Sequence, residues 1–142
     1  NNFTAIGLRI LSNPLRHPTC NLEELHLRDN HNTINDEVVT AFAHALANNL
    51  SLKVLQFGYT RFVTPRGWSA VANVLCSKSS IDSIYASNHT LTGLLSKSIL
   101  PNDLVSSLEL NQNNNKFEIA RTKILQNHFS NGINNLQRNF WK

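Results

Sequence analysis

Apolar and polar positions follow the same order at four places along the chain. The stretches LEELHLRDN, LKVLQFGYT, IDSIYASNH and VSSLELNQN begin at residues 22, 52, 81 and 105. Each has an apolar residue at its first, fourth and sixth places. Because alternate side chains of a strand point to the same face, the fourth and sixth residues would face inward together. The pattern predicts a short strand at each of the four places.

A polar residue at the ninth place marks where the chain would leave each strand. The ninth residues are Asn30, Thr60, His89 and Asn113, with Asn88 just before the histidine. Asparagine amides and threonine hydroxyls bond backbone groups of turns. We therefore expect Asn30, Thr60 and Asn113 to stabilise turns, and we expect the turn at His89 to be the least regular.

Helices are predicted between the first three strands. Residues 36–47 and 65–76 carry apolar residues at the three- and four-residue intervals of an amphipathic helix. Thr64 would cap the second helix, and Pro65 would occupy its first position, where the missing N–H does no harm. The predicted strands are separated by 30, 29 and 24 residues, within or near the spacing of repeats that combine a strand with a helix.

The units that begin with LEELHLRDN and LKVLQFGYT resemble leucine-rich repeats of the ribonuclease-inhibitor type, which also occur in the sensor domains of intracellular immune receptors. The resemblance covers about residues 1–113, two units closely and two loosely. It implies an α/β solenoid with parallel strands on a concave face and helices on a convex face. The phrases GWSAVANVLC and ARTKILQNHF also resemble repeat proteins of diatoms and other microalgae.

The chain divides into a repeat region and a C-terminal segment. Residues 1–115 are predicted to hold three to four leucine-rich repeats. The first is interpreted as incomplete, because its short helix, ending before Pro14, would follow a strand upstream. Residues 116–142 are predicted to form a C-terminal capping helix, KFEIARTKILQNHF, and a tail.

The concave face is the first candidate site. In this architecture the side chains between the inward-facing leucines point out of the sheet, and solenoids present such curved surfaces to partners. Mixed charge and an aromatic side chain suit protein recognition. The predicted partner-binding residues of this face are His26, Arg28, Gln56, Tyr85 and Glu109.

The loop GYTRFVTPRGW, residues 58–68, is a second candidate, because it gathers aromatic and cationic side chains. One interpretation is a rim site for a partner or a phosphate group, made by Tyr59, Arg61 and Arg66. The other is loop packing, with Phe62 covering the start of the following helix.

Composition narrows the classes of partner and the cellular compartment that we expect for the chain. The net charge of +4 is mildly basic and lacks the strong clustering of dedicated nucleic-acid binders. No run approaches the roughly 18 apolar residues that would cross a bilayer, so no membrane partner is predicted. The two cysteines, Cys20 and Cys76, form no CxxC pair and no disulfide framework. Two reduced thiols favour a reducing compartment, and we expect a cytoplasmic protein.

The sequence carries no recognised motif for chemistry. His17 and Cys20 have no second ligand pair to complete a metal site. Nucleophile-elbow, phosphate-loop and zinc-helix motifs do not occur. We expect no enzyme activity, metal, cofactor or small-molecule substrate. Three N-x-S/T sequons, at Asn2, Asn49 and Asn88, are given no weight, because an asparagine-rich chain produces them by chance.

The predicted function is that of a non-catalytic protein–protein interaction module. One alternative is regulation of an enzyme, as an activator of small GTPases or an inhibitor of nucleases, activities found among relatives of this fold. A basic chain fits the inhibitor of a basic nuclease poorly. Another alternative is weak nucleic-acid binding through the C-terminal basic residues, with Arg121 and Lys123 expected to point outward. The residues of that hypothesis are Arg121, Lys123, Arg138 and Lys142.

Overall fold

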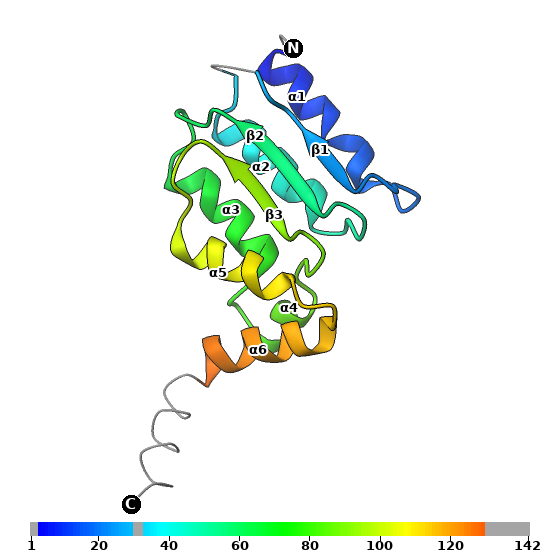
Figure 1. Cartoon of the computed structure of the whole chain (residues 1–142), viewed down its shortest axis with the longest axis vertical. Helices are drawn as coiled ribbons and strands as arrows, with labels where there is room; N and C mark the ends of the chain where they lie inside the picture. Colours follow the sequence, from blue (N-terminus) through cyan, green and yellow to red (C-terminus); the bar gives the residue numbers. More distant parts are fainter. Residues whose placement is uncertain (1–2, 30–32, 130–142) are drawn as a thin grey trace, which may run out of the picture.

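Three parallel strands form a single sheet in the order β1-β2-β3. The computed structural model describes residues 3–29 and 33–129. Helices cover one face of the sheet (Figure 1), which confirms the α/β class. The strands are β1 (Glu24–His26), β2 (Val54–Gly58) and β3 (Gly93–Ser96).

The helices fall into two groups (Figure 1). The first group lies against the sheet, where α1 packs on α2 and α2 packs on α3. The second group gathers beyond β3, where α6 packs on α4 and α5. The first group comprises α1 (Ala5–Leu11), the short 3-10 helix η1 (Asn13–Arg16), α2 (Asp36–Leu46) and α3 (Pro65–Leu75). The second comprises α4 (Ile81–Tyr85), α5 (Asn102–Asn111) and α6 (Lys116–His128).

The core lies between the sheet and α2 and α3. Leu55 of β2 stands in register with Leu25 of β1 and with Leu94 of β3. Two residues along β2, Phe57 meets Phe42 of α2 edge to face, with 5.4 Å between ring centroids. The alternation of the sequence therefore sends Leu55 and Phe57 to the helices and leaves the residue between them on the open face of the sheet.

The third predicted strand is wrong, because residues 81–85 form the helix α4. Ser80 and Ser83 make a reciprocal capping box at its start, and such a box favours a helix. The third strand, β3, comes later, in the segment that begins at Leu91. Leu91 and Leu94 are buried and hold the first and fourth places of the pattern.

The fourth predicted strand is also wrong, because residue 105 lies inside α5. Leu104 and Leu108 are buried four residues apart, which places them on one side of a helix. Asn113 therefore follows a helix and not a strand. Its side chain accepts a hydrogen bond from the Asn115 amide, at 2.8 Å, in the turn that leads to α6.

The start of α3 is held by the first residue of α2. Asp36 accepts hydrogen bonds from the backbone amide and the hydroxyl of Thr64, at 2.7 and 2.6 Å, and Thr64 caps the helix as predicted. These bonds lower the pKa of Asp36 against the opposing effect of burial. Gly67 leaves the room for this carboxylate, since a Cβ there would lie 2.5 Å from Asp36 Oδ1 and 2.9 Å from Val63 Cγ1.

Gly67→Ala is expected to lower the free energy of unfolding by about 1–3 kcal/mol, because the added methyl group must displace Asp36 or Val63. Urea denaturation measures this change. Gly7→Ala in α1 is the matched control, since its Cβ would meet Thr4 Oγ1 at 3.4 Å. Alanine improves helix propensity there, so stability should hold or rise. Equal stability of Gly67→Ala and wild type would contradict the close approach of Asp36.

Candidate functional site

The open face of the sheet carries a connected polar network. His26 of β1 bonds Gln56 of β2 through Nδ1, at 2.8 Å, and Glu24 through Nε2, at 3.0 Å. Arg28 Nε donates to the same Gln56 oxygen at 2.6 Å. The network forms because His26 and Gln56 stand opposite each other in the parallel register. It fixes exposed side chains in defined positions across two strands.

The network favours the charged form of His26. Both ring nitrogens face oxygen acceptors, so both can donate only when the ring is protonated. The bonds to Gln56 and then to Glu24 raise the pKa of His26 most, and the charge of Glu24 adds to them, whereas desolvation and the charge of Arg28 act in the opposite direction. Protonation of His26 therefore strengthens the arrangement of this face.

A hollow of about 470 Å³ opens where the strands end. Two of its lining residues have left-handed backbone conformations, with φ of 64° at Asp29 and 79° at Gly58. Lys97 Nζ stands 3.9 Å from the centroid of the Tyr59 ring, and Leu95 is exposed. The lining residues are Arg28, Asp29, Gln56, Gly58, Tyr59, Leu95, Ser96 and Lys97. The hollow therefore combines an aromatic ring, an aliphatic side chain and charges of both signs.

The turn after β2 supports this hollow. Thr60 is buried, and its hydroxyl bonds the hydroxyls of Ser96 at 2.5 Å and Ser98 at 2.8 Å. The threonine thus ties the end of β2 to the end of β3. Asn30, predicted to do the same after β1, lies outside the described residues.

The structure brings together only part of the predicted face. His26, Arg28 and Gln56 are adjacent, whereas Tyr85 lies in α4 and Glu109 lies in α5. The placement of these last two residues on strands was wrong, because the segments that hold them are helical. Leu95, not Tyr85, stands opposite Gln56 on β3.

Only one of the three predicted rim residues lies at the hollow. Tyr59 lines the hollow, whereas Arg61 and Arg66 are not among its lining residues. The Arg61 guanidinium lies 4.7 Å from the centroid of the Phe62 ring. Arg66 lies in the first turn of α3, where its charge helps to lower the pKa of Asp36.

Three buried asparagines form a ladder that the sequence analysis missed. Asn49 Nδ2 donates to the carbonyl of Leu15, at 2.8 Å. Asn88 donates to the carbonyl of Asn49 at 3.0 Å, and Asn111 donates to that of Asn88 at 3.2 Å. Two of these residues are the sequons set aside above, and each stands three positions before a buried leucine, Leu52 and Leu91 in turn. The repeated offset was the available signal.

Lys123 of α6 ends this asparagine ladder (Asn49, Asn88 and Asn111). The expectation that it points outward is wrong, since its side chain is buried with 1% exposed. Its ammonium donates to the Leu75 carbonyl at 2.6 Å and to Asn111 Oδ1 at 2.7 Å, and it lies 3.1 Å from His89 Nδ1. Burial lowers the pKa of Lys123 to about 8, and burial together with Lys123 lowers the pKa of His89 to about 4.

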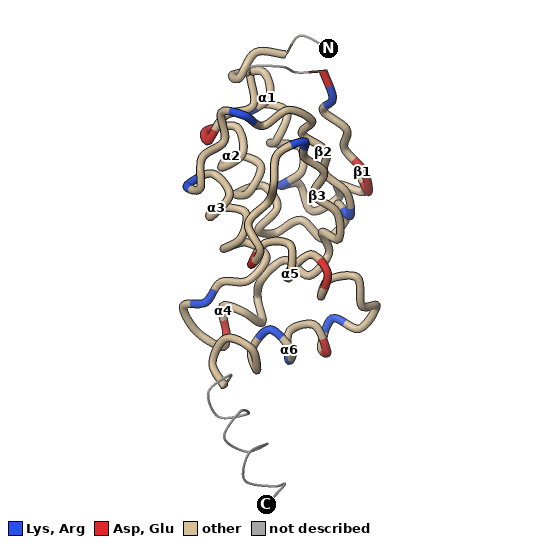
Figure 2. The backbone as a smooth tube through the Cα atoms, turned by 60° about the vertical axis from the view of Figure 1, so that its left-hand side comes forward, with Lys and Arg blue, Asp and Glu red and all other residues tan. Residues whose placement is uncertain are grey.

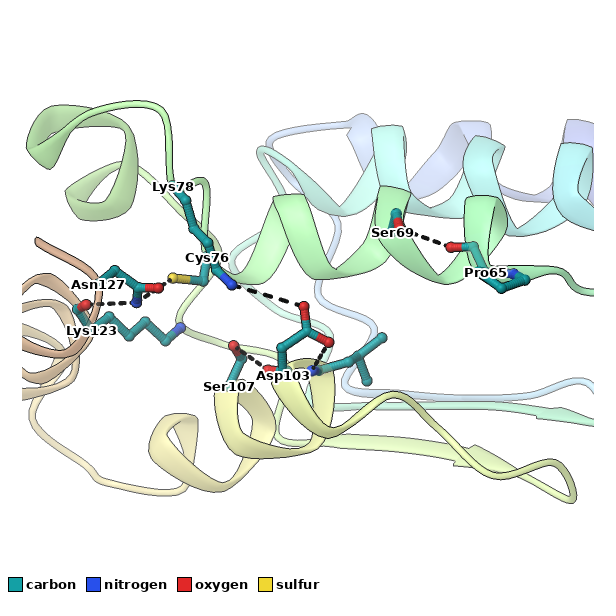
Figure 3. Close-up of polar contacts among 9 residues, drawn as sticks. Pro65, Ser69, Cys76, Lys78, Asp103, Ser107, Lys123 and Asn127 are labelled. Carbon is teal, nitrogen blue, oxygen red and sulfur yellow. Dashed lines mark hydrogen bonds and ion pairs between the residues drawn. The ribbon is translucent and has the colours of Figure 1, made fainter. Parts of the chain in front are cut away.

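Cys76 lies beside this lysine (Figure 3). Asn127 of α6 donates to the sulfur at 3.5 Å and to the Lys123 carbonyl at 2.8 Å. A cavity of about 80 Å³ adjoins the thiol, with Lys78 and Asp103 4.0 Å apart on its wall. Burial raises the pKa of Cys76, which keeps the thiol protonated at neutral pH and favours a packing role over a nucleophilic one.

Within residues 3–29 and 33–129, no group of three or more His, Cys, Asp or Glu side chains could hold a metal ion. In the part of the chain that the structure describes, no helix has the length and apolar character needed to span a bilayer. Lys and Arg are spread over the elements and interspersed with Asp and Glu (Figure 2).

No protein-family model matches the chain, and no curated protein or solved structure gives a significant match.

Proposed function

We propose that the chain is a non-catalytic protein-interaction module of the leucine-rich repeat type, which binds a partner protein on the open face of its sheet. Parallel strands backed by helices, with leucines in register, support the solenoid assignment. In a solenoid this open face is the concave surface. The observation that carries the proposal is the hollow at the ends of β1–β3 beside the ordered network of His26, Arg28 and Gln56.

The chemistry of the hollow suits a protein better than a small charged ligand. Its walls combine the Tyr59 ring, the exposed Leu95 side chain and charges of both signs. Aromatic and aliphatic anchors within a polar rim are typical of protein interfaces. Tyr59, Leu95 and Lys97 therefore join His26, Arg28 and Gln56 as the proposed contact residues, and Tyr85 and Glu109 no longer belong to this surface.

The nucleic-acid alternative has less support than the sequence suggested. Lys123 is buried, and Arg121 pairs with Glu118 at 3.5 Å. Arg138 and Lys142 lie outside the described residues. In the part of the chain that the structure describes, Lys and Arg are interspersed with Asp and Glu (Figure 2), an arrangement that offers little of the phosphate neutralisation on which such binding depends.

Quantitative affinity capture from a lysate of the source tests the proposal, with Leu95→Glu compared against Ile99→Glu. Both leucine and isoleucine are exposed, and Ile99 does not line the hollow. Partners recovered by wild type and Ile99→Glu should be depleted at least tenfold with Leu95→Glu. Equal recovery with both variants would refute binding at this face.

A further inference from the structure

A second exposed surface lies away from the open face of the sheet, between α4, the start of α6 and the segment before β2. Leu50, Tyr85 and Phe117 are 76%, 55% and 70% exposed, and the two rings stand 6.3 Å apart at 45°. They border a groove of about 320 Å³. Apolar side chains gathered around a groove on a surface commonly mark an interaction site.

The polar part of this groove is positive. Lys116 extends across its wall, with Nζ 3.4 Å from Thr90 Oγ1, and the side chain is exposed. His89 is neutral at physiological pH, because its pKa is lowered to about 4. Among the described residues that line the groove, none is Asp or Glu. The lining residues are Leu50, Tyr85, Ala86, Ser87, His89, Thr90, Lys116, Phe117 and Ala120.

We propose that this groove binds an acidic peptide segment of a partner protein. A large apolar side chain of the segment packs on the exposed side of the Tyr85–Phe117 ring pair, where it shields both rings from water. A neighbouring carboxylate of the segment pairs with Lys116, whose charge is not offset by an acidic residue in the lining. The net charge of +4 favours the approach of the same kind of partner.

Charge argues against two other occupants. Residues 130–142 include Phe140 and Trp141, but their charged residues are Arg138 and Lys142, which do not complement Lys116. A second copy of the chain would place two Lys116 side chains near one another if the same groove were used by both copies. A segment that joins apolar and acidic residues satisfies both parts of the groove.

Peptide titration tests this inference on the full chain. Three labelled probes carry Phe-Leu flanked on both sides by glutamate, serine or lysine, and fluorescence anisotropy reports their affinities. The glutamate probe should bind at least tenfold more tightly than the serine probe, and the lysine probe should bind least. Backbone amide shifts in NMR spectra should move at Tyr85, Lys116 and Phe117.

Matched variants separate the two parts of the groove. Lys116→Glu should reverse the preference toward the lysine probe, whereas Arg9→Glu, at an exposed residue of α1 that does not line the groove, should leave it unchanged. Phe117→Ser should weaken the glutamate probe at least tenfold, and Ile99→Ser should not. Circular dichroism checks that the variants remain folded, which their exposure favours.

Several results would overturn the inference. One is equal binding of the three probes. Another is a set of backbone amide shifts confined to the open face of the sheet, which would leave partner binding on that face as the only supported proposal. Tighter probe binding after combined Phe140→Ser and Trp141→Ser substitution would make residues 130–142 the occupant. If sedimentation velocity showed a dimer of the wild type that Phe117→Ser dissociates, the occupant of the groove would be a second copy of the chain.

Discussion

Asn88→Ala is expected to lower the free energy of unfolding by about 3–5 kcal/mol, because it leaves several buried polar groups without partners. The Asn88 amide donates to the carbonyls of Leu46 and Asn49, at 2.8 and 3.0 Å. Its oxygen accepts from the backbone amides of Thr90 and Leu91, both at 2.9 Å. One side chain thus connects the end of α2, the loop before β2 and the entry to β3.

Equilibrium urea denaturation measures this loss, and the chain supplies its own controls. Asn48 is exposed and adjacent to the ladder residue Asn49. Asn48→Ala should change stability by less than about 0.5 kcal/mol, as surface substitutions usually do. Asn49→Ala should be clearly destabilising. If Asn88→Ala and Asn48→Ala were equally stable, the asparagine ladder would not hold the segments together.

Lys123→Ala is expected to lower the free energy of unfolding at pH 7 by about 3 kcal/mol. The substitution deprives the buried Leu75 carbonyl and Asn111 Oδ1 of their donor and leaves a cavity under α6. Lys116→Ala, an exposed lysine of the same helix, should cost less than about 0.5 kcal/mol. Urea denaturation compares the two, and limited proteolysis should cut α6 faster only in Lys123→Ala. Equal stability would show that α6 does not depend on the buried ammonium.

The same lysine should make stability depend on alkaline pH. Its pKa is lowered from 10.5 to about 8 in the folded chain. Between these values the unfolded chain binds more protons at this position, so the free energy of unfolding rises with pH, by up to about 1.4 kcal/mol per unit. Below pH 8 both states are protonated and this dependence disappears.

Lys123→Met isolates this dependence, because it keeps an unbranched apolar side chain without the titrating group. The difference in unfolding free energy between wild type and Lys123→Met should move in favour of wild type from pH 8 to pH 10. Lysines and tyrosines away from this site are shared by both proteins and cancel in the difference. Both proteins carry Cys76→Ala in this comparison, because the charges of Cys76 and Lys123 shift each other's pKa. A constant difference over this range would refute the burial of a titrating amine.

The apolar pattern of the sequence predicted the correct element where the residues of that element alone set its type and its start. Strands β1 and β2 lie within the predicted stretches 22–30 and 52–60, where two large apolar residues stand two apart, Leu25 and Leu27 or Leu55 and Phe57, and favour a strand with one buried face. Helices α2 and α3 have apolar stripes that bury against the sheet, and Thr64 and Pro65 mark where α3 begins. These features depend on neighbours within a few residues, so the sequence contains the information.

The pattern failed where two structures satisfy it equally. Apolar residues three apart, such as Ile81 and Ile84, fit both the start of a repeat strand and one side of a helix. The Ser80 capping box and the pairing of β3 with β2 decide between them. For Leu104 and Leu108 the decision comes from packing of α5 against α3 and α6.

The sequence by itself determined the α/β class, two of the three strands, the four helices α1, α2, α3 and α6, and the grouping of His26, Arg28 and Gln56. The tertiary structure alone decided the position of β3, the asparagine ladder, the inward turn of Lys123 and the pairing of Tyr85 with Phe117. The physical reason is the distance along the chain between the residues that interact. Strand alternation and helix periodicity act between residues a few positions apart, whereas Asn49 and Asn88, or Leu75 and Lys123, meet only after the chain has folded.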